Sequence, residues 1–162
     1  MTASRFLVAA TVLAGLAVPA SAEAARSPTP IGAATAAAHR YWGAVPCSGQ
    51  VKVLARSALT AGVNPTTDAW ATFTSSLGAN NLTAPAGSYR NCAISLARWR
   101  WPTTASMHED WDLLCATVIH ETGHLLGRPH DSRRGSIMAP VFGERSKLPS
   151  ICRTMRPRAA RR

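Results

Sequence analysis

Three histidines and a glutamate in one short run constrain this chain more than any other feature of its sequence. If the run is helical, His120 and His124 lie one turn apart on the same face and can bind one metal ion. Glu121 lies beside them, where it can act on a metal-bound water molecule without binding the metal itself. Gly127 can adopt the left-handed conformation that ends a helix, which returns the chain and brings His130 to the metal. Three protein ligands leave the fourth tetrahedral position of a zinc ion open, and this is typical of a catalytic site.

The full pattern is His-Glu-x-x-His-x-x-Gly-x-x-His, followed by Met138 within the sequence Ser-Ile-Met-Ala-Pro. It resembles the signature of the metzincin zinc peptidases, and within that group the chain looks like a small secreted matrixin (peptidase M10A-like). The resemblance implies an α+β, zincin-like fold. In that fold a small twisted mixed β-sheet packs on the zinc-binding helix, which is followed by a Met-turn and a C-terminal helix.

The resemblance also implies a function, a zinc endopeptidase with one catalytic Zn²⁺ ion. Zinc on the three histidines lowers the pKa of its water, and Glu121 takes the proton of that water as it attacks the peptide carbonyl. Met138 forms an apolar floor beneath the metal. Val141 and Phe142 are expected to wall the pocket for the side chain that follows the cut bond, with an apolar preference there.

Three parts of the fuller family pattern are missing from this sequence. No Pro-Arg-Cys-Gly cysteine switch precedes the motif. Outside the motif only His39 and His108 remain, too few for the second, structural zinc of animal matrixins. The only tyrosines are Tyr41 and Tyr89, so no tyrosine ligand follows the Met-turn.

The first 22 residues have the form of a secretory signal peptide. Arg5 supplies the positive charge, residues 6–18 are apolar, and Ala20-Ser21-Ala22 fits a cleavage site after Ala22. We therefore expect a secreted, extracellular protein without a transmembrane segment. Residues 23–31 are expected to be a linker or short leader, and residues 32–152 the catalytic domain.

Four cysteines lie in the predicted mature chain, and in an exported protein this even number indicates two disulfides. Of the three possible pairings we favour Cys47–Cys92 and Cys115–Cys152. An alternative is that Cys47 is a thiol that blocks the zinc, which would leave one cysteine without a partner.

The net charge of +10 includes five arginines crowded between Arg153 and Arg162. Residues 153–162 are therefore expected to form a basic tail, solvated or in weak contact with anionic surfaces. No motif with interleaved aromatic residues accompanies the tail, so we expect no specific nucleic-acid partner. The expected partner is a peptide or protein substrate, and the expected state is a monomer. An alternative function is a basic protein that holds zinc without catalysis and binds anionic polymers of the cell envelope.

Periodicity and turn residues predict the order of the elements. We expect helices over residues 33–42, 109–126 and 147–155, strands over 50–55, 69–74 and 92–99, and a loop over 77–88. The first helix is expected to pack on the sheet. Ser106 and Glu109 have the spacing of a capping box, with Asp110 and Asp112 at the start of the motif helix. These acids could alternatively suggest calcium, although nothing else in the sequence supports a calcium site.

Overall fold

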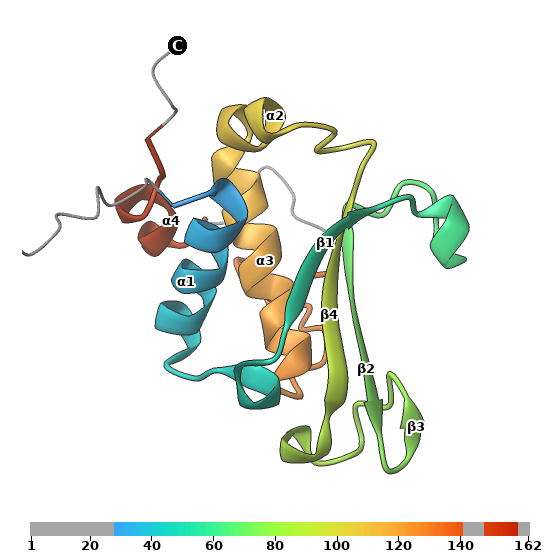
Figure 1. Ribbon diagram of the computed structural model, residues 1–162. Coiled ribbons are helices and arrows are strands. Elements are labelled where there is room, and N and C mark those ends of the chain that lie inside the picture. The colour runs from blue at the N-terminus through green and yellow to red at the C-terminus, as the bar shows by residue number, and fades with distance from the viewer. Residues whose placement is uncertain (1–27, 141–147, 159–162) are drawn as a thin grey trace, which may run out of the picture.

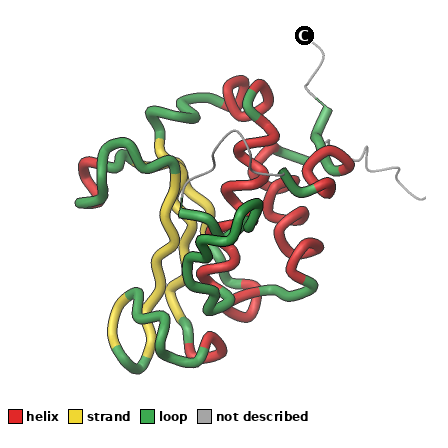
Figure 2. Tube along the Cα trace, turned by 180° about the vertical axis from the view of Figure 1, so that it is seen from behind, coloured by secondary structure: helices red, strands yellow, loops and turns green. Residues whose placement is uncertain are grey.

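The structure of the protein is a computed structural model that describes residues 28–140 and 148–158. The predicted signal peptide, Val141 and Phe142 lie outside these residues. A layer of helices covers one face of a narrow, twisted sheet (Figure 1, Figure 2). The helices are α1 (Pro30–Trp42), α2 (Thr104–Glu109), α3 (Trp111–Leu125) and α4 (Ser150–Thr154). The strands are β1 (Lys52–Arg56), β2 (Ala69–Ser75), β3 (Gly78–Ala79) and β4 (Arg90–Ala97).

The sheet is mixed, as the resemblance implied. Within the described residues its strand order is β1-β4-β2-β3. β1 runs parallel to β4, whereas β2 is antiparallel to both β4 and β3. The central strand β4 is the most deeply placed, with Ile94 and Leu96 at 2% and 0% exposure. The predicted loop over residues 77–88 contains the short strand β3 and a 3-10 turn at Ala86–Ser88.

The alanine-rich helix α1 packs against α3, and the expectation that it would pack on the sheet is wrong. Ala34, Ala37 and Ala38 are fully buried, and their small side chains let the two helices lie close together. α3 itself contacts β2 and β4, so it lies between α1 and the sheet (Figure 1). α1 also begins earlier than predicted, because the Thr29 side chain accepts a hydrogen bond from Gly32 N at 3.1 Å and caps the helix.

The predicted helix over residues 109–126 corresponds to α3, and a short helix that was not predicted, α2, precedes it, with Asp110 between the two. The capping box is formed by Thr103 and Ser106, not by Ser106 and Glu109: Ser106 N donates to Thr103 Oγ1, and Thr103 N donates to Ser106 Oγ, both at 3.1 Å. Ser106 is thus the third residue of α2. Asp110, with φ −101° and ψ 34°, ends α2 and precedes α3.

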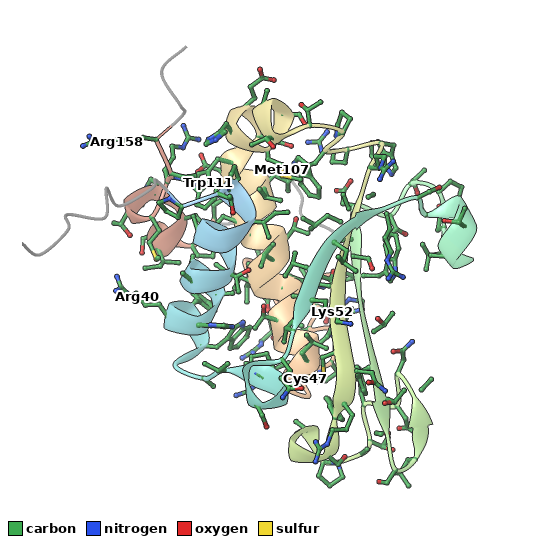
Figure 3. The ribbon with its side chains drawn as sticks, in the orientation of Figure 1. Arg40, Cys47, Lys52, Met107, Trp111 and Arg158 are labelled. Carbon is green, nitrogen blue, oxygen red and sulfur yellow. A yellow bond between two sulfur atoms is a disulfide. The ribbon has the colours of Figure 1, made fainter. Side chains whose placement is uncertain are left out.

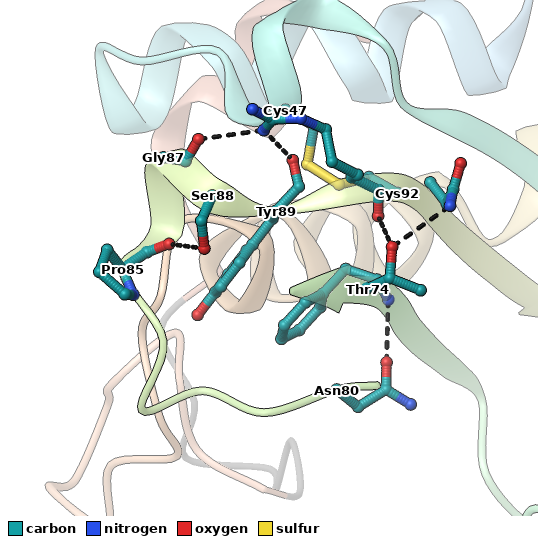
Figure 4. Close-up of a disulfide and its surroundings, with 11 residues drawn as sticks. Cys47, Thr74, Asn80, Pro85, Gly87, Ser88, Tyr89 and Cys92 are labelled. Carbon is teal, nitrogen blue, oxygen red and sulfur yellow. Dashed lines mark hydrogen bonds between the residues drawn. A yellow bond between two sulfur atoms is a disulfide. The ribbon is translucent and has the colours of Figure 1, made fainter. Parts of the chain in front are cut away.

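Two disulfides join distant parts of the fold with the pairing favoured from the sequence. Cys47–Cys92 ties the turn after α1 to β4 (Figure 4), and Cys115–Cys152 ties α3 to α4. Cys47 is therefore not a thiol available to a metal. Near the first bridge the rings of Phe73 and Tyr89 stack at 3.9 Å.

The helical layer has its own buried interior. Trp111 is fully buried, and its Nε1 donates a hydrogen bond of 2.6 Å to the carbonyl oxygen of Cys152. Figure 3 shows Trp111 and Met107 within this layer, whereas Arg40 and Arg158 project from its outer side. No helix among residues 28–140 and 148–158 is long and apolar enough to span a membrane.

Candidate metal centre

α3 places two of the three predicted ligands side by side. His120 and His124 are separated by one helical turn, and their Nε2 atoms lie 3.1 Å apart. His120 is buried at 6% exposure, and His124 is partly exposed at the end of the helix. The predicted helical spacing is therefore present in the structure.

A glycine turn brings the third histidine to the other two. Gly127 has φ +77°, a conformation that favours glycine. Gly127 N donates to His124 O, and Arg128 N donates to Gly123 O, both at 2.9 Å, so the helix ends in a Schellman motif. The reversed chain places His130 Nε2 at 3.2 Å from His124 Nε2.

Main-chain carbonyl groups fix the orientation of two imidazole rings. His120 Nδ1 lies 2.8 Å from Ile137 O, and His124 Nδ1 lies 2.8 Å from Arg128 O. A carbonyl oxygen can only accept, so both Nδ1 atoms carry the proton and both Nε2 lone pairs point toward the centre of the cluster. Histidines that bind a metal through one ring nitrogen usually donate a hydrogen bond from the other, as these two can.

The donor set fits a tetrahedral metal ion. Nitrogen ligands about 2.0–2.1 Å from zinc lie about 3.3 Å from one another. The two short Nε2 separations agree with this value, and all three ligand atoms lie within 4.8 Å of one another. Because Nε2 of His120 and of His124 both present lone pairs, a shared cation would make their close approach favourable. The cluster could hold one zinc ion.

Burial keeps two of these imidazoles in the neutral form that binds metal. It lowers the pKa of His120 to about 4, with further lowering from His124 and His130, while the hydrogen bond to Ile137 O opposes the shift. Burial also lowers the pKa of His124. Neutral imidazoles remain available as ligands at pH values where an exposed histidine is protonated.

Glu121 lies next to the cluster but is not one of its ligand groups. Its side chain is 6% exposed, and burial raises the pKa of the carboxyl to about 7, although a hydrogen bond from the main chain of Ala71 in β2 opposes the shift. Carboxyls with such a pKa can accept and return a proton near neutral pH.

Met138, the residue predicted as an apolar floor, is buried at 5% exposure. Its side chain lies against Gly123 of α3, the residue before His124. The turn that holds it is braced by Asp131: Asp131 N donates to Met138 O at 2.9 Å, and Ser136 Oγ donates to the Asp131 carboxylate at 3.1 Å. Arg133 forms an ion pair with the same carboxylate at 2.6 Å and holds its pKa near 2.

Trp42 supports the site in a way that the motif does not indicate. Its Nε1 donates a hydrogen bond of 2.8 Å to the carbonyl oxygen of Ile119, the residue before His120. The Arg128 guanidinium lies over its ring, 5.8 Å from the centroid. Trp42 is 77 residues from Ile119 in the chain, so no local spacing could have predicted this contact.

The acidic residues at the start of α3 form ion pairs with arginines. Asp110 contacts Arg100 at 2.8 Å, and Asp112 contacts Arg156 at 3.4 Å. In the part of the chain that the structure describes, the three histidines of the motif are the one group of three or more potential ligands that could share a metal.

Comparison with known proteins supports the interpretation of this site. A protein-family model described as matrixin (peptidase M10) matches residues 37–151, which is more than half of the chain. Comparisons with curated proteins and with solved structures found no match. The matched region contains the whole histidine cluster, Glu121 and Met138.

Proposed function

Because the chain belongs to the matrixin family of peptidases, we propose that it is a secreted zinc endopeptidase with Glu121 as its catalytic base. One observation carries the proposal. The Nε2 atoms of His120, His124 and His130 converge within the range of a single ion, with the buried carboxyl of Glu121 beside them. A structural zinc site is normally closed by four protein ligands, whereas this cluster supplies three.

The reaction follows from the chemistry of these groups. Zinc bound to the three histidines would lower the pKa of a water molecule and polarise the carbonyl group of the peptide. Glu121 accepts a proton from the water as its oxygen adds to the carbonyl carbon. The carboxyl then donates this proton to the amine nitrogen as the carbon–nitrogen bond breaks. The raised pKa of Glu121, about 7, suits both transfers near neutral pH.

Secretion is part of the proposal because two features agree with it. Residues 1–22 have the composition of a signal peptide, and both disulfides are of the kind that persists in oxidising compartments. Detection of a mature chain that begins at Glu23 in the culture medium would test this part.

The catalytic proposal is tested by replacing Glu121 alone. Glu121→Ala is expected to bind one zinc per chain while its kcat falls by a factor of about 10³ or more, because the proton acceptor is gone but the ligands remain. Zinc content and hydrolysis of a peptide library are measured on the same samples. Glu109→Ala, an exposed carboxylate at the end of α2, serves as the matched control and should keep full activity. Normal peptide hydrolysis by Glu121→Ala would falsify the assigned role.

A further inference from the structure

A cavity of about 530 Å³ opens beside Glu121 and His120. One wall is the stripe of α3 formed by Leu113, Thr117 and Glu121, which are spaced one helical turn apart. Ala69 of β2 and Pro140, after the Met-turn, line the same cavity. A substrate held for attack beside Glu121 would place a neighbouring side chain in this space.

Asp68 lines the cavity directly before β2. Its carbonyl oxygen accepts a hydrogen bond of 2.7 Å from Ala97 N, which fixes the main chain at this point. Along the strand Asp68 lies three residues, or roughly 10 Å, from Ala71, whose main chain contacts Glu121. The main chain of Asp68 is therefore set back along the cavity from the residue that contacts Glu121.

The carboxylate of Asp68 has no ion-pair partner within 4.0 Å among the described residues. Arg100 also lines the cavity, but its guanidinium pairs with Asp110 at 2.8 Å. Asp68, Arg100 and Asp110 together carry one net negative charge, in a chain whose net charge is +10. Partial burial raises the pKa of Asp68; nearby Arg100 opposes this shift and Asp110 adds to it. A cation in the cavity would compensate the desolvated carboxylate.

We propose that this cavity receives the substrate side chain next to the cut bond, and that Asp68 selects a lysine or arginine there. The inference rests on the proposed peptidase function. The methylene stem of either side chain fits along Leu113, Ala69 and Pro140, while its charged head reaches the carboxylate. Trp99, which is 54% exposed, lines the same cavity, and an aromatic ring there would add a favourable contact with a cation.

An apolar occupant is the competing possibility, and it is the preference expected from the sequence. Such a side chain would displace water from Asp68 without supplying a partner for its charge, which is unfavourable. Lysine and norleucine therefore form the most informative pair of substrates, because they share a stem and differ in the charged head alone.

The test compares two peptides that differ only by lysine or norleucine after the cut bond, within a sequence taken from a library cleavage profile. The wild-type protein is expected to give a kcat/KM at least tenfold higher for lysine. Asp68→Asn should reduce the value for lysine about tenfold and change the value for norleucine less than twofold. Glu109→Gln, which removes an exposed carboxylate that does not line the cavity, is the matched control and should preserve the preference.

A binding measurement separates this inference from the proposed function. Two hydroxamates that carry the same two side chains are titrated into the zinc-loaded protein. If the wild-type protein binds the lysine compound more tightly and Asp68→Asn does not, the inference is supported. This holds even if no peptide is hydrolysed, and that result would contradict the peptidase function alone. Equal binding of both compounds by the wild-type protein overturns the inference, whether or not peptides are cut.

Discussion

The side chain of Met138 occupies the space that a side chain at position 123 would need. A Cβ atom on Gly123 would overlap the Met138 sulfur and lie 2.9 Å from Cζ2 of Trp42. Gly123 is adjacent to His124 on α3, so the glycine allows Met138 and Trp42 of α1 to pack against the part of the helix that carries the histidines. The motif permits any residue at this position, and the structure gives the reason for a glycine.

We predict that Gly123→Ala destabilises the protein by about 1–3 kcal/mol, because the new methyl group displaces Met138 and Trp42. Alanine favours a helix more than glycine does, so propensity alone predicts the opposite sign. The free energy of unfolding is measured in urea. Gly87→Ala is the control, since a Cβ there meets nothing within 4 Å. A stabilised Gly123→Ala protein would show that Met138 does not pack as described.

Local spacing was sufficient to predict the histidine cluster, because helix geometry alone aligns His120 with His124. The glycine turn to His130 follows from the same kind of local rule. The contact between Trp42 and Ile119 and the position of Asp68 in the cavity depend on packing between segments far apart in the sequence.

The short helix α2, which was not predicted, shows a different limit of sequence reasoning. Ser106 can cap a helix through Glu109 or complete a capping box with Thr103, and both readings satisfy a short-range rule. The structure adopts the second, so that Asp110 lies at the junction and forms an ion pair with Arg100.

The disulfide between α3 and α4 is predicted to contribute more to stability than the one at Cys47. The two bridges enclose 37 and 45 residues. By lowering the entropy of the unfolded chain, each stabilises the folded state by a similar amount, about 4 kcal/mol. Cys115 and Cys152 are fully buried, and Cys152 O also accepts the hydrogen bond from Trp111. Replacing this pair by alanines should therefore cost more than replacing Cys47 and Cys92, as measured by urea unfolding. A smaller loss for the buried pair would contradict this order.

In the metal-free protein, His120 and Glu121 should change the free energy of unfolding in opposite directions as the pH changes. The pKa of His120 is lowered from 6.5 to about 4, so the unfolded state binds more protons between these values and stability falls as the pH decreases. The pKa of Glu121 is raised from 4.5 to about 7, so the folded state binds more protons in that window and stability rises as the pH decreases. The two effects largely cancel in the wild-type protein.

Glu121→Gln should remove that cancellation. In the presence of a chelator, its free energy of unfolding is expected to fall by about 3 kcal/mol or more between pH 6.5 and 4, because the lowered pKa values of His120 and His124 are then no longer opposed by Glu121. The wild-type curve should be much flatter over the same range. Urea unfolding at a series of pH values gives both curves, and parallel curves would show that Glu121 does not have a raised pKa.

The C-terminal arginines are predicted to be dispensable for peptide hydrolysis. Arg158 projects from the outer side of the helical layer, away from the sheet (Figure 3). We expect truncation after Arg158, combined with Arg153→Gln and Arg158→Gln, to change kcat/KM less than twofold. Arg156 must be kept, because it pairs with Asp112 at 3.4 Å at the start of α3.

The same variant decides between the peptidase and the alternative, a zinc-holding protein that binds anionic envelope polymers. The wild-type protein and the arginine variant are both assayed for peptide hydrolysis and for sedimentation with an anionic polymer. The peptidase function predicts that hydrolysis is retained, because the histidine cluster and Glu121 lie on other elements of the fold. If the wild-type protein hydrolyses no peptide and loses polymer binding on truncation, the alternative function is supported. The arginines then act through their charge, and added salt should weaken the binding that remains.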